Sequence, residues 1–391
     1  DCRAASSARD IAREPGSVMR LVIERSELLR ALGHVTSVVE RRTTIPILGN
    51  VLLKADGSTL MLKATDLERE VIEQAPAEVQ QPGATTVQAQ VLHDIARKLP
   101  DGSQVEITRD VEKERLTIRS GRSSFALQTL APEDFPDIGI GEMANEFEVP
   151  ADDLKRLIDK TRFAISTEET RYYLNGIYLH SATSDDGKPV LRAVATDGHR
   201  LARVELPLPP GAANMAGVII PRKTVHELHR LIEGTEAPIK IGISATKARF
   251  ELGTVVLTSK LIDGTFPDYG RVIPQHNDKL LKVSNAEFAN AVDRVSTIAS
   301  ERGRAVKLNI EPDKVVLTVV NPEGGSATEE VAAEYGSTPI EIGFNARYLM
   351  DISGQLENGI AHFLLSDSGS PTMVRDEDDT SALYVLMPMR V

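Results

Sequence analysis

The sequence predicts an α+β protein of three similar domains, each with two helices on one face of a largely antiparallel sheet. Three observations support this fold class. A strand-to-helix pattern occurs three times, a second helix follows each copy, and strands with close-spaced turn signals outnumber helices. The length of 391 residues agrees, since about 150 residues per domain gives two or three domains. Repeated helix-on-sheet units also favour an array or closed ring whose equivalent helices line one surface.

The first helix of each copy follows a strand-like stretch. The three segments are LVIERSELLRALGHV from Leu21, FEVPADDLKRLIDKT from Phe147 and LKVSNAEFANAVDRV from Leu281. In each, apolar residues first alternate and then take helical spacing. Capping residues are predicted at the helix starts from Ser26, from residues 151–153 and from Ser284 with Asn285.

The second helix is predicted over residues 91–99, 224–232 and 348–356. A polar residue and a glycine follow each helix, and this pair is typical of a helix end: Asp101-Gly102, Glu233-Gly234 and Asn358-Gly359. The repeats therefore predict domains over residues 19–143, 144–272 and 273–391.

Composition restricts the class of protein. Hydrophobic residues make up 41% and charged residues 26%, as in ordinary globular proteins. The single cysteine, Cys2, excludes internal disulfides and fits a reducing compartment. No apolar run reaches the roughly 20 residues that span a bilayer, so we expect a soluble, cytoplasmic protein without membrane contact. Residues 1–18 are predicted to be a disordered extension or residues foreign to the native chain, with Met19 the natural start.

The formal net charge of −12 is unevenly distributed along the chain. The predicted helical segments are residues 25–42, 89–99, 152–162, 222–232, 286–304 and 345–356, and together they carry a charge of +6. The rest of the chain therefore carries −18. Solvated faces of amphipathic helices explain the basic residues, but not the acidic excess elsewhere. A basic helical face on an acidic body suits loose contact with the DNA backbone. No helix-turn-helix, zinc or stacking motif indicates base readout.

A catalytic interpretation starts from the segment Thr196-Asp197-Gly198-His199-Arg200, with Ser259 as a possible nucleophile. Thr65-Asp66 occupies the equivalent place in the first copy without the histidine, so a turn explains the shared part. We expect no catalytic residue. No cluster has the spacing of metal ligands, and no glycine-rich segment has that of a phosphate loop, so no metal or cofactor is expected.

Exposed aromatic and soft apolar side chains indicate binding surfaces. Tyr172 and Tyr173 are adjacent and cannot both face one side of a strand, so at least one is expected near the surface. Core packing of one ring is the alternative to an interface or DNA contact. Met387-Pro388-Met389 near the C-terminus suits a peptide groove.

Several motifs resemble the signature stretches of one family, the bacterial β sliding clamps, from Met19 to Val391. They are Ile45-Pro-Ile-Leu-Gly-Asn50, Arg171-Tyr-Tyr-Leu-Asn-Gly176, Ala195-Thr-Asp-Gly-His-Arg-Leu201, Pro221-Arg-Lys223, Thr258-Ser-Lys260, Phe266-Pro-Asp-Tyr269 and Met387-Pro-Met-Arg390. The resemblance implies a non-catalytic processivity subunit of DNA polymerase III. Two chains would close head to tail around duplex DNA, with helices of the clamp fold lining the ring and antiparallel sheets outside.

The resemblance also implies three sets of site residues. The partner-peptide pocket falls on Arg171, Tyr173, Leu174, Thr196, Gly198, His199, Arg200, Leu201, Pro267, Arg271, Val272, Val385 and Met387. DNA contacts fall on Arg42, Tyr172, Tyr173, Arg222 and Lys223. The dimer contact falls on Phe125 and Leu127 of one chain and Thr297 and Ile298 of the other.

The partners implied are duplex DNA, without sequence preference, and proteins that present short linear peptides: the DNA polymerase III alpha subunit, the clamp loader, other polymerases and repair proteins. Gly270 and Pro371 depart from residues common in the family and are expected to reshape peptide preference. Two other classes stay open at this point. One is a hydrolase or transferase built on Asp197 and His199, and the other is a monomeric repeat scaffold for protein partners only.

Overall fold

The computed structural model describes residues 19–300 and 304–391, so the expectation for residues 1–18 lies outside the described residues. The chain forms two compact units. The first contains the residues up to Ile140 together with Arg249–Ser259, and the second contains Gly141–Ala248 and Lys260–Val391.

The first unit is an antiparallel sheet with two helices. Its elements are β1 (Arg20–Glu24), α1 (Arg25–Val35), η1 (Thr36–Val38), η2 (Pro46–Gly49), β2 (Asn50–Asp56), β3 (Thr59–Thr65), β4 (Arg69–Pro76), β5 (Glu78–Gln81), β6 (Gly83–Gln88), α2 (Ala89–Lys98), β7 (Gln104–Asp110), β8 (Arg115–Ser120), β9 (Ser123–Leu130) and η3 (Pro132–Asp134). The strands follow the order β4-β3-β2-β6-β9-β8-β7-β1-β5, and β17 (Val255–Lys260) pairs with the outer edge of β4.

The second unit contains the third repeat and the second repeat apart from most of its strands β16 (Lys247–Leu252) and β17, which belong to the first unit. The second repeat comprises β10 (Asn145–Val149), α3 (Ala151–Asp159), η4 (Arg162–Ala164), η5 (Glu169–Leu174), β11 (Gly176–Thr183), β12 (Pro189–Thr196), β13 (Arg200–Pro207), β14 (Val218–Pro221), α4 (Arg222–Ile232), β15 (Ile239–Ile243) and β16 (Lys247–Leu252), followed by η6 (Tyr269–Arg271). The third comprises β18 (Lys279–Ser284), α5 (Asn285–Ser296), β19 (Ala305–Glu311), β20 (Lys314–Asn321), β21 (Gly325–Tyr335), β22 (Ile340–Asn345), α6 (Ala346–Ser353), β23 (Ile360–Leu365), β24 (Thr372–Asp376) and β25 (Ala382–Leu386).

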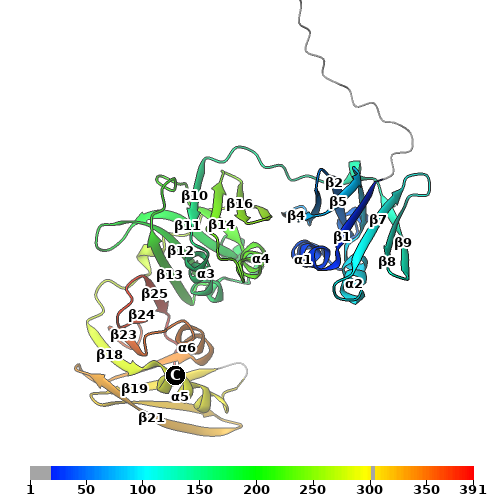
Figure 1. Cartoon of the computed structure of the whole chain (residues 1–391). Coiled ribbons are helices and arrows are strands. Elements are labelled where there is room, and N and C mark those ends of the chain that lie inside the picture. Colours follow the sequence, from blue (N-terminus) through cyan, green and yellow to red (C-terminus); the bar gives the residue numbers. More distant parts are fainter. Residues whose placement is uncertain (1–18, 301–303) are drawn as a thin grey trace, which may run out of the picture. The chain divides into compact units, whose positions relative to one another are not determined.

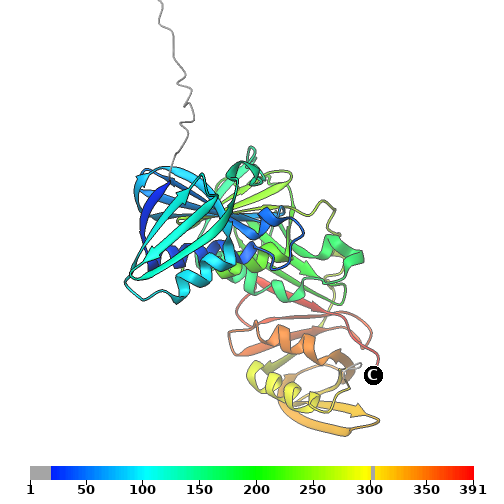
Figure 2. The ribbon, with the colours of Figure 1, turned by 90° about the vertical axis from the view of Figure 1, so that its right-hand side faces the viewer.

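One continuous sheet joins these two repeats, in the order β14-β11-β12-β13-β25-β24-β23-β18-β21-β20-β19-β22. The two helices of each repeat pack against each other, α1 on α2, α3 on α4 and α5 on α6. Figure 1 labels these pairs, and Figure 2 shows α5 and α6 side by side on the strands of the third repeat. The expected α+β architecture is therefore confirmed.

Alternation and helical spacing place the core where the sequence indicates. Along β20, buried Val315, Leu317 and Val319 alternate with more exposed residues, so one face meets the helices. Helix α3 buries Leu154, Leu157 and Ile158 along one stripe.

Helix caps and ends differ from the prediction. Ser284 caps α5 by accepting a hydrogen bond from the Glu287 N–H, but neither α1 nor α3 has a side-chain cap. Ser26 is not the N-cap of α1. That position is held by Glu24, because β1 runs directly into the helix at Arg25. The glycines at the three predicted helix ends, Gly102, Gly234 and Gly359, all have a positive φ, between 72° and 86°. Helix α6, however, ends at Ser353, well before Gly359.

The helices are also less basic than predicted, because several basic residues flank them. The formal charges are +1 for α1, +1 for α2, −1 for α3, +2 for α4, −1 for α5 and zero for α6, which gives +2 in total. Arg41 and Arg42 lie beyond α1 in an irregular segment, and Lys160 and Arg162 lie beyond α3. The predicted basic surface therefore depends on segments at the helix ends.

In the described part of the chain, no helix is long and apolar enough to cross a membrane.

Candidate functional site

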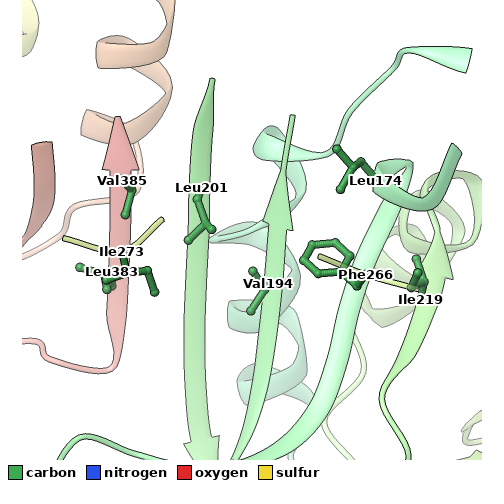
Figure 3. Packing of buried hydrophobic residues seen from close by; sticks show 8 residues of the cluster. All are labelled: Leu174, Val194, Leu201, Ile219, Phe266, Ile273, Leu383 and Val385. Carbon is green, nitrogen blue, oxygen red and sulfur yellow. The ribbon is translucent and has the colours of Figure 1, made fainter. Parts of the chain in front are cut away.

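A cluster of apolar side chains lies where the second and third repeats join. Strand β13 of the second repeat pairs antiparallel with β25, the last strand of the third, with Leu201 opposite Val385. The cluster contains Leu174, Val194, Leu201, Ile219, Phe266, Ile273, Leu383 and Val385 (Figure 3). Both repeats supply its walls, so the site depends on their packing.

Four exposed residues of the predicted pocket are one or two positions in sequence from residues of this cluster. Val272 is 47% exposed and Met387 is 37% exposed, and Pro267 and Arg271 are exposed as well. The Met387 N–H donates to the His199 carbonyl at 3.0 Å, which places the C-terminal segment against the turn before β13. Buried apolar walls beside exposed apolar side chains form a surface that can receive the side chains of an extended peptide.

The turn that carries His199 is used twice in the chain. Asp197 Oδ1 accepts hydrogen bonds from the His199 and Arg200 N–H groups, and Thr196 Oγ1 donates to the Arg200 carbonyl at 2.7 Å. In the first unit, Asp66 accepts from the N–H groups two and three residues ahead, and Thr65 donates to the Arg69 carbonyl. The Asp197 carboxylate therefore shapes a turn, as its twin does without any histidine.

Gly198 allows that turn to approach its neighbour. Its φ is +88°, and a Cβ there would lie 2.5 Å from Arg171 Nη1. Arg171 in turn donates to both carboxylate oxygens of Glu168, at 2.7 and 2.8 Å. This hydrogen bond lowers the pKa of Glu168 below its usual value. The rim of the predicted pocket is thus an ordered ion pair.

Arg200 holds the two repeats together. Its guanidinium donates to Asp351 at 2.5 Å, to the Phe163 carbonyl at 2.7 Å and to Asp197 at 3.2 Å, and it lies 4.3 Å from the Tyr348 ring centre. Only 8% of the side chain is exposed. The Arg200 charge is therefore paired within the joint with α6 and is almost completely shielded from solvent.

Several residues of the site were missed by the sequence analysis. Tyr348 stacks on His199, with ring centres 6.3 Å apart, and burial raises the pKa of its hydroxyl. Val194 and Leu383 lie two residues before Thr196 and Val385, so strand alternation was a signal for them. No local pattern pointed to Tyr348, because it reaches the turn through the packing of α6.

The predicted DNA-contact residues of the second repeat lie next to one another. Tyr172 is 53% exposed and meets Tyr173 edge to face at 5.7 Å. Arg222 and Lys223 are exposed in the first turn of α4, and the Arg222 N–H donates to the carbonyl of Asn175, just after η5. In the first unit, Arg42 is exposed and lines a cavity of about 980 Å³ together with Arg41, Gln88, Gln90 and Gln128.

The predicted dimer residues lie by two strand edges. Strand β9 pairs with β8 along Ser123–Gln128, but with β6 only at Thr129 and Leu130. Phe125 and Leu127 alternate there with exposed residues. Strand β21 pairs with β20 along residues 325–332 and with β18 only along residues 333–335. The Ile298 carbonyl accepts from Asn321 Nδ2 at the β20–β21 turn. Within the described residues, one edge of each strand is thus unpaired over most of its length, along Ser123–Gln128 of β9 and residues 325–332 of β21.

Nothing at these sites resembles a catalytic centre. Ser259 is fully buried, and among residues 19–300 and 304–391 no group of three or more His, Cys, Asp or Glu side chains is placed to hold a metal ion.

Three repeats of this fold, joined strand to strand and bearing an apolar cluster at a joint, define the class of DNA clamps. Family models of the DNA polymerase III beta subunit match in order: the N-terminal domain over residues 19–139, the central domain over 148–268 and the C-terminal domain over 270–390. The chain belongs to this family. It is a sliding clamp, a non-catalytic processivity subunit, and this confirms the resemblance seen in the sequence.

Similar proteins and solved structures support the same family assignment. The beta sliding clamp of Caulobacter vibrioides strain NA1000 / CB15N is 52% identical over 373 residues, which is 95% of this chain and 100% of the relative. That of Escherichia coli K12 is 38% identical over 374 residues, again 95% and 100%. Crystal structures of the C. crescentus clamp with polyethylene glycol bound and of a Bartonella birtlesii clamp bound to griselimycin each match with a TM-score of 0.92 at 52% identity, over 96% of this chain and 100% of theirs.

Proposed function

We propose that two copies of this chain close head to tail around duplex DNA, and that each copy holds partner proteins through the cluster between its second and third repeats. The domains would span residues 19–143, 144–272 and 273–391. A protein that acts on bacterial DNA during replication would be located in the cytoplasm.

The observation that carries the ring is a strand junction that recurs. Arg69–Glu73 of β4 pair antiparallel with Val255–Ser259 of β17, and Arg200–Val204 of β13 pair in the same way with Ala382–Leu386 of β25. In both cases the strand that follows the Thr-Asp turn pairs with the last strand of the next repeat. In the third repeat the corresponding strand is β21, and the last strand of the first repeat is β9.

Both of these strands have one edge that is unpaired over most of its length, so β21 of one chain can pair with β9 of another by the same rule. Such pairing removes two edges that would otherwise invite aggregation. A head-to-tail contact of this kind forms a ring when its rotation closes. Phe125 and Leu127 beside β9, and Thr297 and Ile298 beside β21, would form the apolar part of the contact.

Contact with DNA would be made through the backbone phosphates. Arg42, Arg222 and Lys223 supply charge, Tyr172 supplies an exposed ring, and the ring of Tyr173 beside it is half-buried. The first-turn N–H groups of α4 add a positive dipole end, which attracts phosphate. The proposed contacts are to the DNA backbone and not to base edges, so binding would be independent of DNA sequence.

The partner surface would take a short peptide with Leu or Phe anchors. Leu174, Leu201 and Val385 form buried walls, and Met387 and Val272 are exposed beside them. The DNA polymerase III alpha subunit, the clamp loader and other polymerases or repair proteins would share this one site. Affinity on the order of micromolar is expected for one or two buried anchors.

The ring is tested by mass in solution. We expect light scattering to give about twice 42.6 kDa at micromolar concentration. Ile298→Asp should give monomers, since it would bury an unpaired carboxylate in the contact. Ile140→Asp changes an apolar residue that is 44% exposed outside both edges, and it should leave the dimer intact. A monomeric unmodified chain, or a dimer that survives Ile298→Asp, would contradict the proposed ring.

A further inference from the structure

A second cavity adjoins the apolar cluster, and His199 is not among its lining residues. It has a volume of about 830 Å³ and is lined by strands β11, β12 and β13, by β24 and β25, and by the Thr265–Gln275 segment. Pro267, a predicted pocket residue, lines it together with Phe266, Ile273 and Leu383 of the cluster. Its other walls are polar, chiefly Arg192, Arg203 and His180. A volume of this size with apolar walls and a few convergent polar groups is typical of a binding site.

Most polar groups of the cavity satisfy one another. Arg192 donates to Glu205 at 2.7 Å and to the Tyr269 hydroxyl at 3.0 Å. The Tyr269 hydroxyl lies 2.8 Å from His180 Nε2, and His180 Nδ1 lies 3.0 Å from the Ser181 carbonyl. Since a carbonyl only accepts, Nδ1 carries the proton and Nε2 accepts from Tyr269. The neutral form of His180 satisfies this network, and burial favours that form by lowering the pKa of His180. The Glu205 carboxylate is engaged by Arg192.

Arg203 is the exception. Its side chain is only 9% exposed, and its Nε has no hydrogen-bond partner. The Glu205 carboxylate lies 3.7 Å from that nitrogen, too far for a hydrogen bond. The only hydrogen bond of its guanidinium that the structure shows goes to Asp185 at 3.3 Å, and the Asp185 side chain is 87% exposed. A buried guanidinium with one long bond to a solvent-facing carboxylate is poorly satisfied.

We propose that this cavity takes the carboxylate of an acidic side chain of a bound partner peptide, which pairs with Arg203 in place of Asp185. The inference rests on the proposed function of the adjoining apolar cluster. A carboxylate matches the planar fork of a guanidinium and can accept from Nε and one Nη together. Asp185, on the β11–β12 turn, then acts as an exchangeable substitute for the ligand.

The position of Arg203 relative to the anchor pocket supports a peptide as the source. Leu201 and Arg203 lie two residues apart on β13 and so face the same side of the sheet, roughly 7 Å apart along the strand. Val194 of the cluster stands opposite Arg203 in the β12–β13 register. An extended peptide that buries its anchor against Leu201 would therefore bring a residue two to four positions away over Arg203.

Charge in the cavity favours a single acidic group. Asp268 also lines the cavity, but its carboxylate accepts from Arg271 Nε at 2.9 Å. Glu205 is held by Arg192. Arg203 is thus the cation available to a ligand carboxylate once Asp185 swings into solvent.

The test uses a set of peptides with one Leu-Phe anchor pair and a single Glu placed in turn at each of four positions on either side. Each Glu peptide has a Gln counterpart, and affinities for the full-length dimer are measured by calorimetry. At one or two positions we expect the Glu peptide to bind on the order of tenfold more tightly than the Gln peptide. That ratio should fall to about one in Arg203→Gln.

A second variant should shift the ratio in the opposite direction. Asp185→Asn removes the competing carboxylate and should increase the preference for Glu. The matched control is Asp186→Asn, which removes the same charge from the same turn, but whose carboxylate pairs with Lys188 outside the cavity lining. It should leave the ratio unchanged.

The inference is wrong if no position prefers Glu, or if Asp185→Asn and Asp186→Asn have equal effects. If the Gln peptides bind and lose affinity in Met387→Ala, the proposed anchor pocket survives even when the Glu preference is absent. If no peptide binds, or binding ignores Met387→Ala, the proposed function of the cluster itself fails. Melting temperature checks that Arg203→Gln is folded. If it is not, Asp185→Asn alone decides the outcome.

Discussion

At the scale of single residues, the same turn supports two different surfaces. Thr65 and Asp66 repeat the hydrogen bonds of Thr196 and Asp197. The residues that flank the turns differ, however. Lys63 and Glu70 stand at the spacing where the second repeat has Val194 and Leu201, and they form a buried ion pair at 3.0 Å. An apolar peptide side chain that entered between Lys63 and Glu70 would leave both buried charges without a partner, which is costly. The first joint is therefore unsuited to the same peptide.

His180 gives the second unit a dependence on pH. Burial lowers the pKa of this histidine below its usual value near 6.5. The folded state thus resists protonation that the unfolded chain accepts. The stability this group contributes is full above about pH 6.5 and falls as pH drops toward the lower folded pKa.

We therefore expect the free energy of unfolding to fall between pH 7.5 and pH 5.5, and to fall less in His180→Gln. Urea titrations at the two pH values measure the difference. His226→Gln, which changes an exposed histidine on α4, is the matched control and should behave like the unmodified chain. An equal loss of stability in His180→Gln and the unmodified chain would contradict the role of His180.

At the scale of elements, one helix cap connects the fold to the site. Asn345 Oδ1 accepts from the Arg347 N–H at 2.9 Å and from the Tyr348 N–H at 3.4 Å, which fixes the start of α6. Tyr348 in turn stacks on His199, and Asp351 of the same helix pairs with Arg200. The entry of α6 therefore positions side chains at the joint of two repeats.

Asn345→Ala should lower the free energy of unfolding by about 1 kcal/mol, as loss of a side-chain cap usually does. It should also weaken peptide binding several-fold, because Tyr348 loses its fixed position beside His199. Ser284→Ala removes the other such cap, on α5, and should cost stability without a matching loss of peptide affinity. Chemical denaturation and calorimetry on the same samples separate the two effects. Equal binding by both variants would show that α6 does not position the site.

The sequence predicted these elements well where the signal was local. Periodicity placed the paired helices of each repeat, and the Thr-Asp turn was recognised as a turn from its twin. The sequence-based prediction was wrong about where some helices begin and end. Ser26 is not a cap, because β1 continues into α1 without a break, and the basic residues counted as helical at Arg41 and Arg42 lie beyond the helix.

For the site, the sequence supplied the strand residues that alternate and missed those brought in by packing. Leu201 and Val385 were found, and their buried neighbours Val194 and Leu383 followed the same alternation. Tyr348 and Arg203 carried no local pattern. Their roles depend on which element packs against them, and only the joint between repeats shows this.

At the scale of the whole molecule, the chain combines a net charge of −12 with helices that sum to +2. An acidic body repels DNA from most of its surface, whereas in the proposed ring a few basic residues near helix ends would meet phosphates. In a closed ring such weak contacts are enough. Dissociation requires the ring to open, while sliding only exchanges one phosphate for an equivalent one.

The contribution of those basic residues is measurable on open linear duplex, where topology does not retain the protein. Affinity should be weak and should fall steeply with salt. Arg42→Ala combined with Lys223→Ala should weaken binding equally for different sequences and reduce the slope of log affinity against log salt by about 2, close to one per lost phosphate contact. Lys54→Ala with Lys240→Ala makes the same change in net charge from exposed strand positions and should leave the slope nearly unchanged. Fluorescence anisotropy on two unrelated duplexes over a range of salt gives all of these values. A strong preference for one duplex, or equal slopes for the two double variants, would mean that the backbone contacts lie elsewhere.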